Sequence, residues 1–175
     1  MNKVLIVVDM QNDFIDGSLG TKEAQGIVPG VLKEIKKDYS FIYATRDTHP
    51  VNYLETNEGR HLPVEHCIKG SEGWQIRKEV EEALREKEHE IVDKPTFGSE
   101  VLVEKLKERN AEKEIDEFVF VGLCTDICVV SNALLVKAAF PEKKLTVLKD
   151  CCAGVTPESH EAALSTMKMC QIGIE

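Results

Sequence analysis

The chain has 175 residues and a formal net charge of −9, with 42% hydrophobic and 30% charged residues. This length and composition predict a single domain, residues 1–175, with a substantial hydrophobic core. The acidic balance disfavours nucleic acid and anionic membrane surfaces as partners, because both require a basic patch on the protein. No apolar stretch approaches the ~20 residues of a membrane span, and the apolar run at the N-terminus is too short for a signal peptide.

The cysteines bear on the redox compartment. They form no Cys-x-x-Cys pair and no export signal precedes them, so they are expected to be reduced thiols in a cytoplasmic protein. The six are Cys67, Cys124, Cys128, Cys151, Cys152 and Cys170.

Predicted strands and helices alternate along the whole chain. Apolar runs predict strands at Val4–Val8, Phe41–Thr45, Glu90–Val92, Phe118–Val121 and Leu145–Leu148, and a sixth within Gln171–Ile174. Helices are predicted at Val28–Lys37 (opened by Pro29), Trp74–Lys87, Glu100–Asn110, from Thr125 to Phe140, and from Pro157 onward with Thr156 as N-cap. Residues 50–73 lack clear periodicity and are expected to form a long functional loop. The order predicts an α/β protein: three layers, α/β/α, around a mainly parallel sheet of five or six strands.

One stretch, Gly122 to Phe140, joins a buried strand to a helix through a tight turn. Thr125 and Asp126 offer an N-cap, which would place Cys128 in the first turn of the helix. The helix dipole favours an anion there, so the pKa of the Cys128 thiol is predicted to fall toward neutrality. The alternative is that Cys128 is a buried core residue, as free cysteines often are.

Four predicted strands are each followed by a reactive residue: Asp9, Asp47, Lys94 and Cys128. Ligands of open parallel sheets bind outside the carboxyl ends of the strands, so these residues are expected to share one edge. A cysteine with an acid and a lysine suits amide hydrolysis: Cys128 attacks the carbonyl, Asp9 shuttles the proton and Lys94 fixes the charges. Backbone N–H groups at the helix start would form the oxyanion hole. The alternatives are a loop cap for Asp9 and a surface charge for Lys94.

A metal site is suggested by Asp47, His49 and the later His66. Two imidazoles and a carboxylate suit zinc, manganese or iron rather than calcium, with waters completing the shell. The alternative is a hydrogen-bonded Asp–His pair in a loop. The remaining histidines are interpreted as surface or capping residues (His61 and His160) or as solvated (His89).

These candidate residues lie in five sequence motifs whose order along the chain is the same as in a known family. The motifs are Val-Asp-Met-Gln-Asn-Asp-Phe at 8–14, Asp-Thr-His at 47–49, His-Cys-x-x-Gly-x-x-Gly-Trp at 66–74, Lys94 with Phe97, and Gly-Leu-Cys-Thr-Asp-Ile-Cys-Val at 122–129. As a set covering nearly the whole chain, they resemble the isochorismatase-like cysteine hydrolases, and within them the nicotinamidase/pyrazinamidase branch.

The resemblance implies a catalytic triad and a metal site. The triad would be Asp9, Lys94 and Cys128, with a metal ion, zinc first, held by Asp47, His49 and His66. It also implies a cis peptide between Leu123 and Cys124, an oxyanion hole from the N–H groups of Cys124 and Cys128, and Phe14 against the substrate ring. The reaction would convert nicotinamide and water to nicotinate and ammonia through a thioester, as a step of NAD salvage. The expected partner is a small-molecule amide, and the expected assembly is a homo-oligomer.

Two departures from the branch leave other functions open. Nicotinamidases often have a tryptophan shortly before the metal histidine, whereas this chain has Leu62-Pro63-Val64-Glu65 before His66. A further metal ligand is present in some of them; Glu55, Glu58 and His61 are candidates here, and none aligns well. The alternatives are therefore a cysteine amidohydrolase acting on another small amide or carbamoyl compound, and a thiol- or metal-binding redox sensor using Cys124 and Cys128. Cleavage of isochorismate is disfavoured because that reaction does not use a cysteine nucleophile.

Overall fold

The computed structural model describes residues 1–175 and contains one six-stranded sheet. All neighbouring strands pair in parallel, in the order β3-β2-β1-β4-β5-β6. The strands are β1 (Lys3–Val8), β2 (Phe41–Asp47), β3 (His89–Lys94), β4 (Glu117–Leu123), β5 (Lys144–Ala153) and β6 (Gly173–Ile174). The predicted α/β class is thus confirmed, as is the mainly parallel sheet of five or six strands, which has six strands and is parallel throughout.

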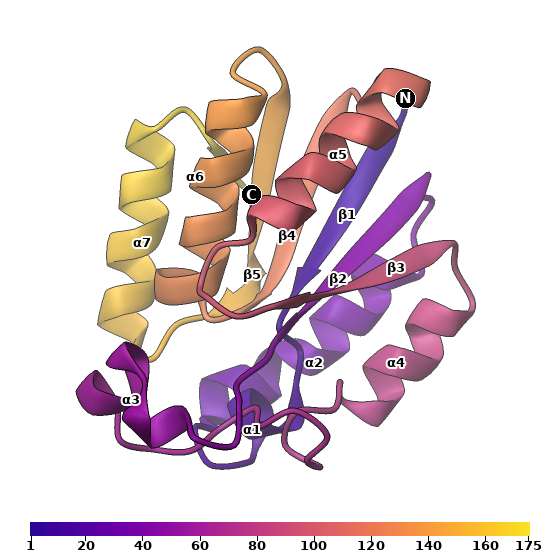
Figure 1. Cartoon of the computed structure of the whole chain (residues 1–175). Coiled ribbons are helices and arrows are strands. Elements are labelled where there is room, and N and C mark those ends of the chain that lie inside the picture. Colours follow the sequence, from indigo (N-terminus) through magenta and orange to yellow (C-terminus); the bar gives the residue numbers. More distant parts are fainter.

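Helices cover both faces of the sheet (Figure 1). They are α1 (Asn12–Ile15), α2 (Lys22–Ile35), α3 (Asn57–His61), α4 (Lys78–Arg85), α5 (Glu100–Glu112), α6 (Val130–Ala139) and α7 (Pro157–Met169), with a 3-10 turn η1 (Tyr53–Glu55) and a π-helical turn η2 (Thr125–Val129). None of the helices is long and apolar enough to cross a membrane.

Strand β1 shows how the side chains divide between two cores. Val4, Ile6 and Val8 pack with residues of α5, α6 and α7, whereas Leu5 and Val7 pack with residues of α2 and α4. Successive side chains of a strand point to opposite faces, so an unbroken apolar run is what a strand covered on both sides requires. The layers leave the carboxyl ends of the strands open, and α1 and α3 lie beyond those ends (Figure 1).

Helix α2 differs from the prediction. It begins at Lys22, after Thr21, whose side chain accepts a hydrogen bond from the Ala24 N–H, and it runs through Pro29 instead of starting there. A proline inside a helix costs ~3 kcal/mol through a lost hydrogen bond and a clash. The apolar stripe on this helix offsets that cost by packing into the core; it consists of Ala24, Ile27, Val31 and Ile35.

The segment from residue 50 to residue 77 also differs. The predicted helix at Trp74 starts only at Lys78, because the preceding backbone pairs with residues 10–12: the Arg77 N–H donates to the Met10 carbonyl and the Asn12 N–H to that of Gln75. Residues 50–73, predicted to be a loop, contain η1 and α3. The Thr56 side chain caps helix α3. This helix was not predicted because its five residues are too few to show a helical pattern in the sequence.

Strands β1 to β5 are all longer than predicted, β2, β3 and β5 by the most consequential margins. Asp47 and Lys94 are the last residues of β2 and β3, not the residues after them, and β5 extends from Lys144 to Ala153. His89 opens β3 and is half-buried, where a solvated side chain was expected; its Nδ1 lies 2.9 Å from the Lys87 carbonyl oxygen.

Candidate active site

Asp9 follows β1 and is fully buried at the centre of the sheet edge. Its backbone has φ +46°, a conformation that residues other than glycine rarely adopt. A hydrogen bond to β2 holds the backbone in place: the Asp9 N–H donates to the Thr45 carbonyl, 3.2 Å away. The Thr45 hydroxyl donates to Asp9 Oδ1 at 2.6 Å, and the Lys94 ammonium lies 2.7 Å from Asp9 Oδ2. The carboxylate is thus held by a hydroxyl and a cation with no access to water.

Lys94 connects this acid to the cysteine. Its Nζ lies 3.3 Å from Cys128 Sγ and also donates to the Thr96 carbonyl at 3.1 Å. Lys94 and Cys128 are both buried. The structure therefore brings together Asp9, Lys94 and Cys128, which come from three different parts of the chain.

The expected low pKa of Cys128 is not found. Burial raises the pKa of the Cys128 thiol well above its usual value, the Asp9 carboxylate raises it further, and Lys94 opposes both. Burial also raises the pKa of Asp9 against the effect of Lys94. For Lys94, burial acts to lower the pKa, but the surrounding acids and thiol outweigh it and raise the pKa above its ordinary value. The resting site is therefore a protonated thiol beside a buried Asp–Lys pair, because burial and the Asp9 carboxylate outweigh the opposing charge of Lys94.

The turn that bears Cys128 is built differently from the prediction. Cys128 lies in the π-helical turn η2, and neither Thr125 nor Asp126 caps a helix. The Thr125 hydroxyl lies 2.8 Å from Nδ1 of His160, in α7, and the Asp126 carboxylate accepts from the Val155 N–H at 3.1 and 3.2 Å. His160, interpreted from the sequence as a surface or capping residue, is half-buried against this turn. The peptide between Leu123 and Cys124 is cis, as the resemblance implied.

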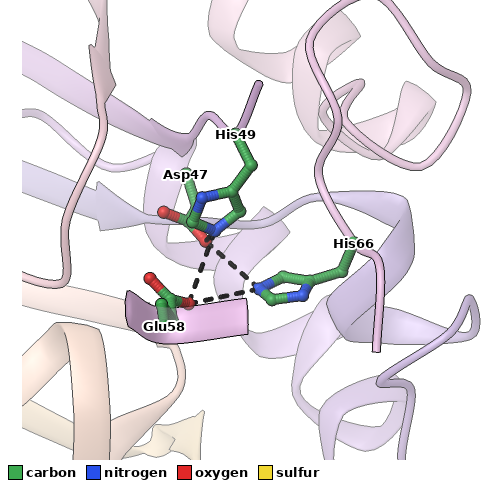
Figure 2. A group of neighbouring side chains, drawn as sticks. All are labelled: Asp47, His49, Glu58 and His66. Atoms are coloured by element: carbon green, nitrogen blue, oxygen red, sulfur yellow. Dashed lines mark hydrogen bonds and ion pairs between the residues drawn. The ribbon is translucent and has the colours of Figure 1, made fainter. Parts of the chain in front are cut away.

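Four side chains form a compact cluster beside the triad: Asp47, His49, Glu58 and His66 (Figure 2). His49 Nε2 lies 2.9 Å from Asp47 Oδ2 and 3.5 Å from Glu58 Oε1. His66 Nε2 lies 3.6 Å from each of the same two oxygens. The three residues predicted to hold a metal are therefore together. Glu58, one of three further candidates in the sequence, joins them from α3, whereas His61 is exposed and contacts the Asn57 carbonyl.

The donor set fits a divalent transition metal. Tetrahedral zinc with ligands at about 2.0–2.1 Å separates neighbouring ligand atoms by roughly 3.4 Å. The four distances given above are 2.9–3.6 Å, and all four donor atoms lie within 4.8 Å of one another. His66 Nδ1 lies 2.8 Å from the Val64 carbonyl oxygen, which leaves Nε2 with a lone pair facing the cluster. Asp47 Oδ1 is buried without a hydrogen-bond partner. Burial acts to raise the pKa of Asp47, but the contacts with His49 and His66 outweigh it and hold the pKa below its usual range, so the carboxylate is a charged ligand.

A cavity of about 230 Å³ lies beside the cluster, and Cys128 is the only triad residue in its wall. Cys128 and Cys124 line it together with Asp47, Glu58 and His66. The rest of the wall is mostly apolar: Phe14, Leu19, Thr21, Ala24, Leu62, Phe97, Ile127, Gly154 and Val155. Phe14 lies in this wall, where the resemblance placed it, and its ring packs against His66 with centroids 5.6 Å apart. A small, largely apolar ring with a polar group at one end suits such a cavity.

Comparison with known proteins identifies the family. A family model described as the isochorismatase domain matches residues 3–174. The chain is 30% identical to an uncharacterised isochorismatase family protein of Bacillus subtilis, over 94% of this chain and 93% of the relative. It is 28% identical to the nicotinamidase of Escherichia coli, over 98% and 92% of the two chains. The crystal structure of a Pyrococcus horikoshii pyrazinamidase in complex with zinc is similar with a TM-score of 0.79, at 27% identity and over 100% and 99% of the chains. The chain therefore belongs to the isochorismatase domain family.

Proposed function

We propose that this protein is an amidohydrolase that converts nicotinamide and water to nicotinate and ammonia. The observation that carries the proposal is the buried contact of Lys94 with both Asp9 and Cys128, at the wall of a largely apolar cavity. The cavity suits an uncharged aromatic ring, and the similar E. coli protein is a nicotinamidase. The reaction would serve NAD salvage.

The first half of the reaction forms a thioester. As Cys128 Sγ attacks the amide carbon, the thiol proton moves to Asp9. The raised pKa of Asp9 favours this transfer, whereas the raised pKa of the Cys128 thiol opposes it, so the proton leaves as the C–S bond forms. Lys94 keeps its charge and stabilises the negative charge that passes from Asp9 to the sulfur. The N–H groups of Cys124 and Cys128 serve the oxyanion of the tetrahedral intermediate. Asp9 then returns its proton to the leaving nitrogen, the C–N bond breaks and ammonia departs.

The second half consumes water. Asp9 takes a proton from a water molecule, which attacks the thioester carbon, and the C–S bond breaks as the proton returns to Cys128 Sγ. Nicotinate then leaves, and the buried thiol and Asp9 are again in their starting protonation states. The sum is one amide and one water consumed, and one carboxylic acid and one ammonia formed.

A divalent metal held by Asp47, His49, Glu58 and His66 completes the proposal, with zinc as the first candidate and manganese or iron as alternatives. Such an ion would act as a Lewis acid that binds a donor atom of the substrate and orients it. Phe14 packs against His66 and lines the same cavity, so it would hold the ring while the amide faces Cys128.

A second amide is the other candidate because Leu62, not a tryptophan, lines the cavity beside the metal cluster. Release of ammonia by the purified protein separates the two. The panel is nicotinamide, pyrazinamide, benzamide and an N-carbamoyl amino acid, with Cys128→Ala as the matched inactive control. Turnover of nicotinamide above the other compounds supports the proposal. Turnover of the carbamoyl compound alone supports the second candidate, and no ammonia from any compound contradicts both.

The redox-sensor alternative is disfavoured by the state of the thiols. Burial raises the pKa of Cys124 to about 12, and that of Cys128 is also raised. Sensor cysteines require thiolate character, and the raised pKa of both thiols keeps them protonated at neutral pH.

A cytoplasmic location and a homo-oligomeric state complete the proposal. All six cysteines are unpaired, which supports a reducing compartment. Light scattering of the purified protein tests the oligomeric state.

A further inference from the structure

Tyr53 lies behind the metal cluster and is fully buried. Its ring packs against both histidines, with centroids 4.7 Å from His49 and 5.0 Å from His66, and the two imidazoles are 4.8 Å apart. The three rings therefore contact one another, with Tyr53 and His66 meeting edge to face at 76°. An imidazole can rotate about two torsions, so it presents Nε2 to a metal only if its surroundings fix the ring. For His49, the packed ring of Tyr53 is the neighbour that fixes the imidazole.

The polar atoms of Tyr53 hold the segment that carries Glu58. The Tyr53 hydroxyl donates to the Leu62 carbonyl at 2.9 Å, just past the end of α3. The Tyr53 carbonyl accepts from both the N–H and the hydroxyl of Thr56, at 2.9 and 2.6 Å. The Thr56 hydroxyl in turn accepts from the Gly59 N–H at 3.0 Å. Hydrogen bonds of Tyr53 thus join the start of the 53–62 segment to its end.

Gly59 shows how tightly this unit is packed. A Cβ atom at this position would lie 2.1 Å from the Tyr53 carbonyl oxygen, so α3 can approach Tyr53 only because residue 59 has no side chain. Glu58 directly precedes this contact, and its Oε1 lies 3.5 Å from His49 Nε2 and 3.6 Å from His66 Nε2. The position of the Glu58 carboxylate therefore depends on the backbone contact between α3 and Tyr53.

We infer that Tyr53 is the positioning residue of the metal centre. Its ring orients the His49 and His66 imidazoles, and its hydroxyl and carbonyl place the helix that presents Glu58. Tyr53 itself binds no metal and contacts no substrate. The inference rests on the proposed metal centre and extends it from the four ligands to the residue that orients three of them.

Zinc affinity tests the role of the ring. The full-length protein is stripped of metal, and zinc binding is measured by competition with a chromophoric chelator. Tyr53→Leu, which removes the ring, should weaken zinc binding by about 10–100-fold, the usual effect of losing an outer-shell partner. Phe118→Leu is the matched control: this buried aromatic packs against Phe140 in the core under α5, α6 and α7, which does not include Tyr53. Its loss should lower stability and leave zinc affinity unchanged. Wild-type zinc affinity in a folded Tyr53→Leu variant would overturn the inference and leave the metal centre standing.

A milder variant tests the hydroxyl and does not depend on the folding of Tyr53→Leu. Tyr53→Phe keeps the ring and loses the bond to Leu62, so zinc binding should weaken by about 2–10-fold. If the hydroxyl acts through Glu58, this loss should disappear in the Glu58→Gln background, because effects of residues in one network are not additive. Equal losses in both backgrounds would overturn the link to Glu58. The cobalt(II) absorption spectrum of each variant reports ligand geometry independently of catalysis. A wild-type protein that binds neither zinc nor cobalt would overturn the inference together with the metal centre, whereas failure of nicotinamide hydrolysis alone would leave both in place.

Discussion

Lys94 Nζ lies 3.3 Å from Cys128 Sγ, and both side chains are buried at the carboxyl edge of the sheet. The same ammonium lies 2.7 Å from Asp9, so one cation faces the acid and the thiol between which a proton must pass. Charges buried this deeply are stable only when they are paired, and removing one member of the group changes the protonation of the others.

The nucleophile should be Cys128 and not Cys124. Cys128→Ala should abolish ammonia release because no other thiol contacts the Lys94 ammonium. Cys124→Ala should retain most of the turnover, since only the backbone N–H of this residue is assigned a role. The two variants are compared at equal concentration, with circular dichroism to verify folding. An inactive Cys124→Ala beside an active Cys128→Ala would reverse the assignment.

Asp9→Asn should change turnover and thiol reactivity in opposite directions. Loss of the proton shuttle should lower turnover by at least ~100-fold, as general acid–base catalysis typically contributes 10²–10⁴-fold. The Asp9 carboxylate raises the pKa of the Cys128 thiol, so its removal should lower that pKa and increase the thiolate fraction at neutral pH. Iodoacetamide should therefore alkylate Cys128 faster in Asp9→Asn than in the wild type. Unfolding would also lower turnover and speed alkylation, because it exposes Cys128, so circular dichroism must first show that Asp9→Asn is folded. If the alkylation profiles of the folded variant and the wild type then coincide, the Asp9 carboxylate does not act on the thiol proton.

Substitution of a metal ligand should lower the metal content of the protein and leave the Cys128 thiol reactive. Asp47→Ala and His66→Ala should each lose bound transition metal and most of the turnover, while Cys128 remains open to alkylation. His61→Ala is the matched control, because this exposed histidine lies outside the cluster. Elemental analysis of protein purified without chelator gives the stoichiometry. Fully active wild-type protein with less than about one tenth of an equivalent of metal would contradict the site.

The contact between Thr125 and His160 should matter for the chemical step. Thr125 is fully buried, and its hydroxyl ties the Cys128 turn to α7. Thr125→Val removes the hydroxyl at nearly constant volume and should lower kcat by about 3–30-fold with little change in KM, because displacement of the nucleophile affects the reacting geometry more than ring binding. Thr125→Ser keeps the hydroxyl and should stay close to the wild type. Equal kcat for the two variants would leave the hydroxyl with a purely structural role.

Glu117, at the opposite edge of the sheet, should make stability depend on pH. Burial acts to raise the pKa of Glu117, but hydrogen bonds outweigh it and bring the pKa to about 2; the donors are Lys144, Lys3 and Thr146. A lowered folded-state pKa contributes stability above the unfolded value near 4.5, and this contribution is lost as the pH falls from there toward 2. Glu117→Gln should therefore cost about 1–3 kcal/mol at pH 7 and less at pH 4. Urea unfolding at both pH values measures the difference, and a cost that is independent of pH would refute it.

The sequence determined the class of the fold and the edge at which the site lies. Apolar strand runs alternating with helical patterns require a parallel sheet with two covered faces, and the chain direction then places Asp9, Asp47 and Lys94 at the same edge. The sequence motif that contains Cys128 also indicated the family, because residue types and their order along the chain can be read without knowing any contacts.

Tertiary structure alone decided which distant groups meet. Glu58 could not be chosen over Glu55 and His61, because the choice depends on how α3 packs against Tyr53. The predicted direction of the Cys128 pKa shift was wrong for a related reason. A helix terminus is visible in the sequence, whereas full burial beside Asp9, which raises the pKa, is not. Short-range patterns specify helices, strands and caps, but electrostatics and ligand geometry depend on distances between residues far apart in the chain, and only packing sets those distances.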